Sequence, residues 1–210
     1  MATQGSTNGA QRRKERTRSA LLEAAQRLIA DGRLNVAVLE ITRAANIGMG
    51  SFYNHFDSKE QLFEAAVADV LDAHGALLDR LTESIEDPAE KFAATFRLTG
   101  RLFRQQTTES DILLANGLAL LSSNRGLAPR ALRDINAAIA AGRFHVADPR
   151  LALAMAGGAL LGLGKLLRDD PDRDDAACAD EAAEGVLRLF GLSADEAHTI
   201  CERPLPDAFA

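Results

Sequence analysis

The residues with the clearest chemistry in this sequence form one face of a short segment, 49–56. On a helical wheel of about 100° per residue, Gly50, Tyr53 and Asn54 fall on this face. Met49, Ser51 and His55 lie at its edges, and Phe52 and Phe56 lie opposite with Gly48. Phenol, amide, hydroxyl and imidazole groups can all hydrogen bond to phosphate oxygens or base edges, and asparagine can pair with adenine through two hydrogen bonds in the major groove. This face therefore suits polar recognition better than bond cleavage.

Two short helices and a tight turn would present this face. We expect helices at about 38–45 and 49–56, joined at Asn46-Ile47-Gly48, because asparagine tolerates and glycine freely adopts the left-handed backbone of such a turn. Ser58 and Gln61 have the spacing of a capping box, which predicts that a long helix begins at the next residue after Ser58. The arrangement is typical of a helix-turn-helix, whose second helix enters the DNA major groove.

A cationic segment precedes these helices on a predicted helix at about 11–30. Residues 1–60 contain nine lysines and arginines against six aspartates and glutamates, although the whole chain has a formal net charge of −6. A basic end on an acidic body favours contact with a polyanion through that end, whereas the alternative is a solvated basic helix start. The further candidate DNA contacts are Arg12, Arg13, Lys14 and Arg43.

The central segment resembles the DNA-binding domain of the TetR family of bacterial transcriptional regulators. The positions that carry the resemblance are Ile41, Ala44, Ala45, Ile47, Gly50, Phe52, Tyr53, His55, Phe56, Ser58, Lys59, Glu60 and Leu62. The resemblance covers roughly residues 12–67. It implies binding to double-stranded operator DNA, with Tyr53 and Lys59 at phosphates, and a repressor that a small apolar effector releases.

Each of these side chains also has a structural interpretation. Tyr53 could pack, Lys59 could be a solvated charge, and His55 could hold the fold. Asn54 could be a polar residue that reads no base. The chain departs from the family pattern at Gly48, which stands where a serine or threonine usually caps the second helix.

The composition predicts an all-α protein. Alanine and leucine dominate, only six prolines occur, and no alternating β-branched runs suggest a sheet. We expect about nine main helices and a short tenth, arranged as a disordered tail (1–10), a three-helix helix-turn-helix domain (11–68) and a ligand-binding and dimerisation bundle (69–210). The helix that begins at Lys59 is predicted to reach Glu86 and to belong to both domains. Helix caps are predicted at Asp87, Ser110, Asp148 and Ser193.

Apolar residues of the second domain are candidates for an effector pocket and a dimer interface. The pocket candidates are Phe92, Phe96, Phe103, Leu113, Asn116 and Leu118, for which plain core is the alternative. The segment 151–167 is rich in small residues, which let helices approach closely. With the last long helix it gives the interface candidates Gly158, Leu161, Gly162 and Leu187, for which a helix of the chain's own core is the alternative. The family resemblance favours a homodimer.

Other function classes find little support. The motifs HExxH, GxSxG and CxxC are missing, and Cys178 and Cys201 lack metal-ligand spacing. We therefore expect no enzyme activity, no cofactor and no metal. The most apolar run, 151–164, is shorter than the roughly 20 residues that span a bilayer, so we expect a cytoplasmic protein without a membrane partner. An all-helical small-molecule carrier without operator function is the alternative.

Overall fold

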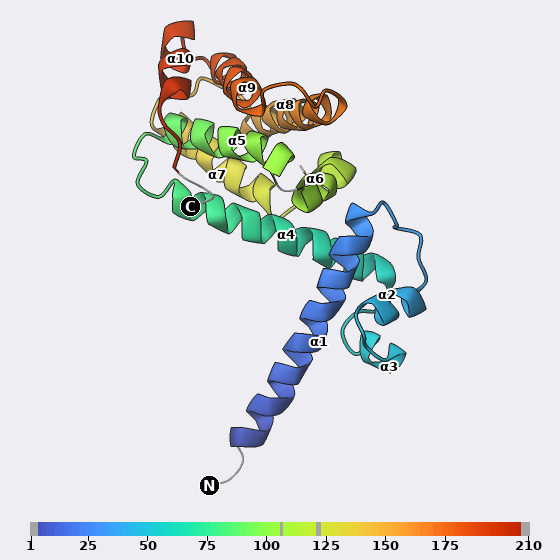
Figure 1. Ribbon diagram of the computed structural model, residues 1–210. Helices are drawn as coiled ribbons and strands as arrows, with labels where there is room; N and C mark the ends of the chain where they lie inside the picture. The colour runs from blue at the N-terminus through green and yellow to red at the C-terminus, as the bar shows by residue number, and fades with distance from the viewer. Residues whose placement is uncertain (1–3, 106, 121–122, 207–210) are drawn as a thin grey trace. The chain divides into compact units, whose positions relative to one another are not determined.

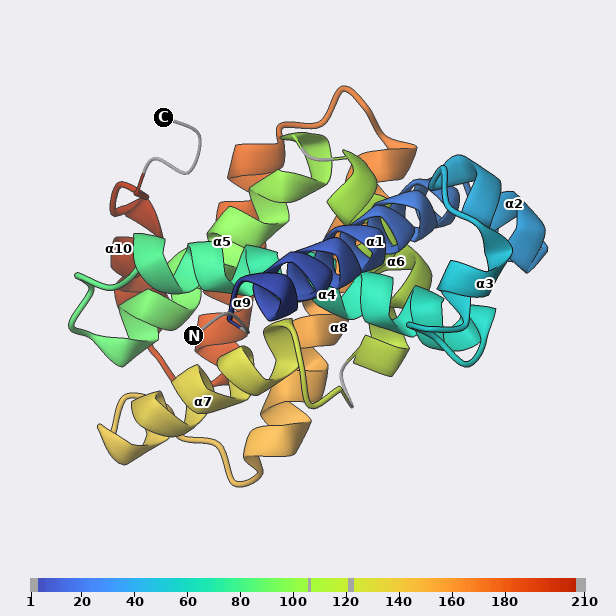
Figure 2. The same ribbon diagram turned by 90° about the horizontal axis from the view of Figure 1, so that it is seen from below.

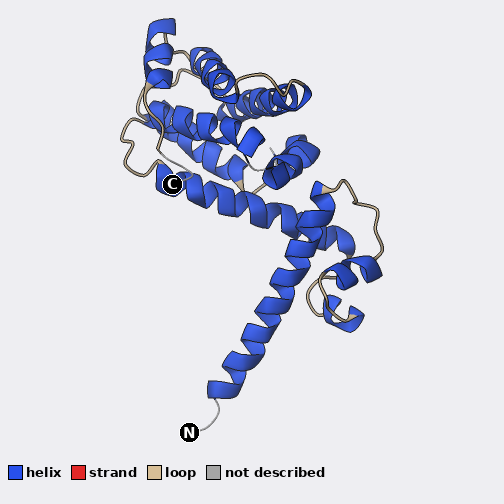
Figure 3. Cartoon of the chain, in the orientation of Figure 1, coloured by secondary structure: helices blue, strands red, loops and turns tan. Residues whose placement is uncertain are grey.

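The computed structural model describes residues 4–105, 107–120 and 123–206. Over these ranges the chain forms helices and no strand (Figure 3), as the composition predicts. It divides into two compact units, Met1–Asp69 and Val70–Ala210, which we call the N-terminal and the C-terminal unit. The division falls inside one continuous helix, α4 (Lys59–Leu81), so no linker separates the units.

The N-terminal unit contains α1 (Gln4–Ala30), α2 (Val38–Ala44), α3 (Met49–Phe52) and the first part of α4. Its core is formed by buried residues of all four helices, among them Leu21, Leu28, Ile41, Phe52 and Leu62. The prediction of a disordered tail over residues 1–10 is wrong for 4–10, because α1 already begins at Gln4. A helix that is nucleated gains one hydrogen bond for each further residue, which favours this extension. Residues 1–3 lie outside the described residues.

The start of α4 confirms the predicted capping box with one difference. The Gln61 N–H donates to Ser58 Oγ over 3.1 Å, while Gln61 Oε1 accepts the N–H of Asp57 over 2.6 Å. The helix ends at Leu81 and not at Glu86, and the Thr82 hydroxyl donates to the Leu78 carbonyl at this end over 2.9 Å.

The C-terminal unit is a helical bundle organised around α5 (Figures 1 and 2). Its helices are α5 (Pro88–Gln105), α6 (Thr107–Leu120), α7 (Leu127–Ala140), α8 (Pro149–Asp169), α9 (Asp175–Leu189) and α10 (Ala194–Glu202). Helix α5 packs against all five of the others. The rings of Phe92, Phe144 and Phe190 meet with centroids 5.0 to 5.5 Å apart and join α5 to the segments that follow α7 and α9.

Three of the four predicted caps of this unit are confirmed. Asp87 accepts the N–H of Ala89, Asp148 accepts those of Arg150 and Leu151, and Ser193 accepts that of Glu196. The cap at Ser110 is wrong, because α6 begins at Thr107. The Ser110 hydroxyl instead donates to the Leu102 carbonyl over 3.0 Å, near the end of α5.

Helix α8 is long and apolar enough, by length and composition alone, to cross a membrane. The apolar run that the sequence indicates, 151–164, is shorter than α8 itself. In the structure α8 packs against α5, α6, α7 and α9, and 28% of its apolar stretch is buried.

Candidate functional site

The second short helix, α3, ends at Phe52 and not at Phe56, so the predicted polar face is formed by α3 and by the turn that follows it, and it is exposed on the N-terminal unit. Asn46 takes the left-handed conformation expected of the turn, with φ of 55°, so α3 can pack back on α2. Phe52 and Phe56 are buried, whereas Tyr53 is 57% exposed and Asn54 is exposed. Met49, Gly50 and Arg43 are also exposed, and Ser51 and His55 are half-buried. Tyr53 packs against its own chain through an edge contact of its ring with Phe52, and more than half of its surface remains exposed.

Lys59 has a structural partner that the sequence did not reveal. Its Nζ donates to the carbonyl of Val36 over 3.3 Å and lies 3.4 Å from Asn35 Oδ1. The first residue of α4 thus holds the loop that leads into α2. An ammonium group has three donors, so one of them remains for a phosphate.

A hollow lined by α1 and α3 gathers several of the predicted residues. Its lining consists of Gly9, Ala10, Arg13, Lys14, Thr17, Ser51, Asn54 and His55, with no acidic side chain among them. Arg12 is exposed on α1 but does not line it. Burial, together with the positive charges of Lys14 and Arg18, lowers the pKa of His55, so its imidazole is neutral at pH 7. Thr17 and Arg18 were not predicted, although both lie among the cationic residues of α1.

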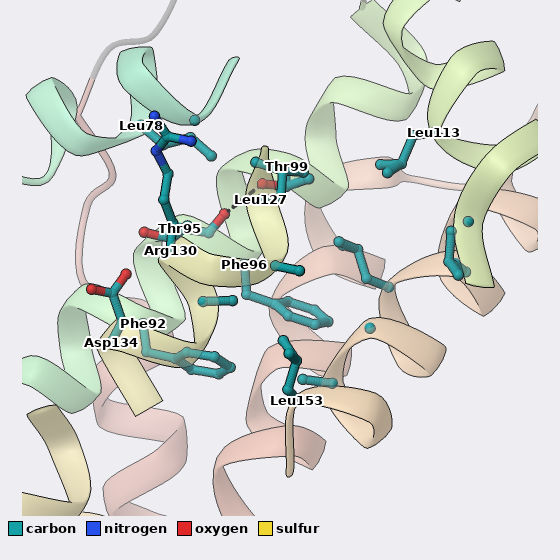
Figure 4. A pocket seen from close by; sticks show the side chains of 18 of the residues that line it. Leu78, Phe92, Thr95, Phe96, Thr99, Leu113, Leu127, Arg130, Asp134 and Leu153 are labelled. Carbon is teal, nitrogen blue, oxygen red and sulfur yellow. Dashed lines mark hydrogen bonds between the residues drawn. The ribbon is translucent and has the colours of Figure 1, made fainter. Parts of the chain in front are cut away.

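The C-terminal unit contains a cavity of about 100 Å³ enclosed by α4, α5, α6, α7 and α8 (Figure 4). Of the predicted pocket residues, Phe92, Phe96 and Leu113 line it. Phe103 does not, because its ring packs over Gly164 beside the buried Leu163 and Leu167. The side chains of Asn116 and Leu118 lie outside the described residues.

Several polar side chains that were not predicted from the sequence border this cavity, although its surface is almost wholly apolar. Asp79 on α4 and Arg130 and Asp134 on α7 line the cavity together with Thr95 and Thr99. Arg130 Nε donates to Asp79 Oδ2 over 3.0 Å. The only sequence signal was a few charges spaced along otherwise apolar helices, and partners on different helices cannot be paired from one sequence.

The same arginine ties α7 to α4 at a second carboxylate, Asp72. Arg130 Nη1 lies 3.3 Å from Asp72 Oδ1, which also accepts the N–H of Gly126 over 2.7 Å. Arg125 Nη2 donates to Asp72 Oδ2 over 2.7 Å, and Arg133 donates to Asp79 over 2.7 Å. We call these contacts the α4–α7 tether. Burial alone would raise the pKa of Asp72 and Asp79, but hydrogen bonds from the tether outweigh it and lower both pKa values.

Gly75 makes room for this tether in the middle of α4. A Cβ atom at this position would lie 2.7 to 2.9 Å from Cδ, Nε and Cζ of Arg130. The guanidinium can therefore lie across α4 between Asp72 and Asp79 only because residue 75 has no side chain.

The predicted interface residues separate into two groups. Gly158 and Gly162 are exposed on α8, and a Cβ atom on either would meet nothing within 4 Å. Leu161 faces the chain's own interior, where it lines the cavity and sits over Gly117. Leu187 is fully buried in the core of its own chain, so its prediction as an interface residue is wrong. The sequence pattern does not say whether Leu187 is covered by its own chain or by a partner chain.

Comparison with known proteins gives consistent matches over both units. Residues 21–66 match the family described as bacterial regulatory proteins, tetR family, and residues 87–203 match a tetracyclin repressor-like C-terminal domain. The HTH-type transcriptional repressor KstR2 of Mycolicibacterium smegmatis is 35% identical over 80 residues, which are 38% of this chain and 39% of that relative. The match thus spans about two fifths of that repressor.

Solved structures extend the similarity over nearly the whole chain. RolR in complex with resorcinol is 33% identical, with 94% of this chain and 98% of that chain covered and a TM-score of 0.67. RolR without ligand is also 33% identical, with coverage of 90% and 98% and a TM-score of 0.75.

The close approach of Arg130 to Gly75 predicts a coupling between the two positions. In an Arg130→Ala background, Gly75→Ala should stabilise the protein by about 0.5–1 kcal/mol, since alanine favours helix. With Arg130 present, the new methyl group should displace the guanidinium and remove this gain. A double-mutant cycle by urea unfolding measures the difference, and Gly185→Ala, where a Cβ meets nothing within 4 Å, is the control. Additive effects at 75 and 130 would contradict the observed contact.

Proposed function

The chain belongs to the TetR family of bacterial regulatory proteins, and from this premise we propose that it represses transcription from a near-palindromic operator until a small hydroxylated aromatic effector releases it. The observation that carries the proposal is the pairing of an exposed, hydrogen-bonding recognition face with an apolar cavity, joined by the single helix α4. A carrier protein would need the cavity but not the recognition face.

The cationic hollow and the α3 face together suit a DNA backbone and one groove. Arg13 and Lys14 supply positive charge beside Ser51 and Asn54, which can reach base edges. Tyr53 and Lys59 can each donate a further hydrogen bond to a phosphate. Neutral His55 can donate one hydrogen bond to a phosphate without adding charge.

The effector class follows from the size and lining of the cavity. A cavity of roughly 150 Å³ lined by aliphatic and aromatic groups accepts benzene, so one of about 100 Å³ suits a ligand of about one ring. Phe92, Phe96 and Leu153 offer apolar contacts. Asp79 and Arg130 are paired with each other and expose almost no polar surface to the cavity, so a ligand hydroxyl group would have to compete with that ion pair. RolR, which has been solved with resorcinol, supports the same class.

The tether offers a route from the cavity to the DNA-binding surface. A hydroxyl that hydrogen bonds to Arg130 or Asp79 competes with their mutual ion pair and weakens the hold of α7 on α4. Helix α4 continues without a break to Lys59, which anchors the loop before α2. A change in α4 can therefore reach the recognition helix through a rigid element.

A second copy of this chain is the partner we propose for the exposed face of α8. Leu151, Met155 and Leu166 are 58%, 40% and 43% exposed, and they continue the line of Gly158 and Gly162 along the helix. Soluble monomers rarely expose a continuous apolar face of this kind. A two-fold dimer would also place two recognition helices about 34 Å apart, one turn of DNA.

The first prediction concerns the operator. Lys59→Ala and Tyr53→Phe should weaken binding to every sequence, whereas Asn54→Ala should mainly relax base choice, by about 1–3 kcal/mol. Arg27→Ala, which removes an exposed cation at the far end of α1, is the charge-matched control and should change affinity little. Fluorescence anisotropy on the duplex upstream of the gene, at two salt concentrations, measures these effects. No affinity for that duplex at low salt would favour the carrier alternative.

The second prediction concerns the dimer. Gly162→Leu should give a folded monomer with poor operator affinity. The single chain has open space at this position, so the variant should fold, but in the proposed dimer the leucine would collide with the opposing helix. Ala137→Leu on the exposed side of α7 is the control and should leave the dimer intact. Sedimentation velocity at micromolar concentration distinguishes the two states. A monomeric wild type, or a dimeric Gly162→Leu variant, would remove this interface.

The third prediction concerns the effector, with resorcinol as the probe. Resorcinol should weaken operator binding by about 5–150-fold, the usual range of allosteric coupling. Phe96→Trp should fill the cavity and abolish this response while ligand-free operator affinity stays within about twofold. Operator titrations with and without resorcinol measure both quantities. Equal loss of operator binding by Phe96→Trp without ligand would show that Phe96 is plain core.

A further inference from the structure

The hollow of the N-terminal unit has room for more than a few water molecules. It encloses about 830 Å³, whereas one water molecule occupies roughly 30 Å³ of liquid. Arg13 and Lys14 line it with positive charge, while Thr17, Ser51 and Asn54 offer neutral hydrogen-bonding groups. Within the described part of the chain, no acidic side chain lines it. The hollow therefore suits an anion, and in an operator complex that anion is a phosphate of the DNA backbone.

Of the described residues that line the hollow, only His55 can change its charge between pH 5 and pH 8. It is half-buried in the turn that follows α3, and the charged side chains of α1 near it are cations. These are Arg13 and Lys14 in the lining, and Arg18, whose guanidinium lies 5.5 Å from the centroid of the next aromatic ring. Asp57 is the nearest carboxylate along the chain, but it is exposed and does not line the hollow.

The free protein keeps the imidazole of His55 neutral for two reasons, and DNA removes one of them. Burial lowers the pKa most, and the positive charges of Lys14 and Arg18 lower it further. A phosphate in the hollow would offset these charges and place a negative charge beside the ring, so the pKa of His55 should be higher in the complex than in the free protein. The protonated ring also donates two hydrogen bonds, whereas the neutral ring donates one.

We propose, on the basis of the proposed function, that an operator phosphate seated in the hollow draws a proton from solvent onto His55, so that operator binding strengthens as the pH falls. Acid strengthens any binding step that takes up a proton. The pKa of free His55 lies below the ordinary 6.5, and that of the complex lies above the free value. The gain in affinity is therefore complete below the free pKa and is lost as the pH rises through the pKa of the complex.

The test measures operator affinity by fluorescence anisotropy from pH 5.5 to pH 8 at constant ionic strength. Wild-type affinity should rise about threefold to tenfold from pH 8 to pH 6. His55→Gln, which keeps a donor but cannot be charged, should bind at every pH about as the wild type does at pH 8. His55→Arg, a permanent cation, should bind independently of pH and more tightly than His55→Gln. His198→Gln removes an exposed histidine of the C-terminal unit and is the control, which should keep the wild-type profile.

NMR titration of the His55 ring, in the free protein and in the operator complex, gives an independent measurement. The pKa should be higher in the complex, and Lys14→Ala should raise the free pKa and so reduce the difference.

Three results would overturn the proposal and leave operator binding itself standing. They are a wild-type affinity that does not change with pH, a pH dependence that survives in His55→Gln, and equal pKa values of His55 with and without DNA. The second result would mean that another group takes up the proton. A wild type that binds the upstream duplex at no pH would overturn the proposed function as well.

Discussion

The hydrogen-bonded ion pairs between α4 and α7 are the interaction on which the rest of this structure depends. Asp72 and Asp79 lie two helical turns apart on α4, and Gly75 between them leaves room for Arg130 to reach both. Asp72 also accepts the N–H of Gly126, the residue that immediately precedes α7, whose N-terminus has no side-chain cap. The tether thus fixes where α7 begins and how closely it approaches α4 beside the cavity.

Such a tether is suited to a switch because it is partly solvated. Arg130 is 26% exposed and the two aspartates about a third, so the net free energy of their pairing is modest. A ligand hydroxyl that offers the same hydrogen bonds can replace an ion pair of this kind without a large barrier of desolvation. The surface of the cavity is almost wholly apolar, which suits an apolar ring. In the proposed function, Asp79 of α4 belongs both to the border of the cavity and to the tether that a ligand would weaken.

Features that depend only on residues close in sequence, such as turns and helix caps, could be predicted from the sequence. The turn at Asn46, the box at Ser58 and Gln61, and the caps at Asp87, Asp148 and Ser193 are local, and the structure contains them. The tether joins residues more than fifty positions apart, and Ser110 bonds to a carbonyl of the preceding helix, so neither follows from local spacing. Likewise, the small residues of 151–167 and the helix that follows suggested Gly162 and Leu187 for the same interface, but composition could not separate a residue inside the chain's own core from one on its surface.

We propose that the tether couples the cavity to operator binding. The variant Asp72→Asn tests this coupling, because Asp72 belongs to the tether but does not line the cavity. Operator affinity should be measured with and without saturating resorcinol, and resorcinol affinity with and without saturating operator, in wild type and variant. In the wild type the two ratios must be equal, since coupling free energy is reciprocal. We expect that Asp72→Asn still binds resorcinol and that it binds the operator more weakly than the wild type does in the absence of resorcinol. The ratio of its operator affinities without and with resorcinol should be close to one. A variant with wild-type operator affinity and wild-type coupling would contradict it.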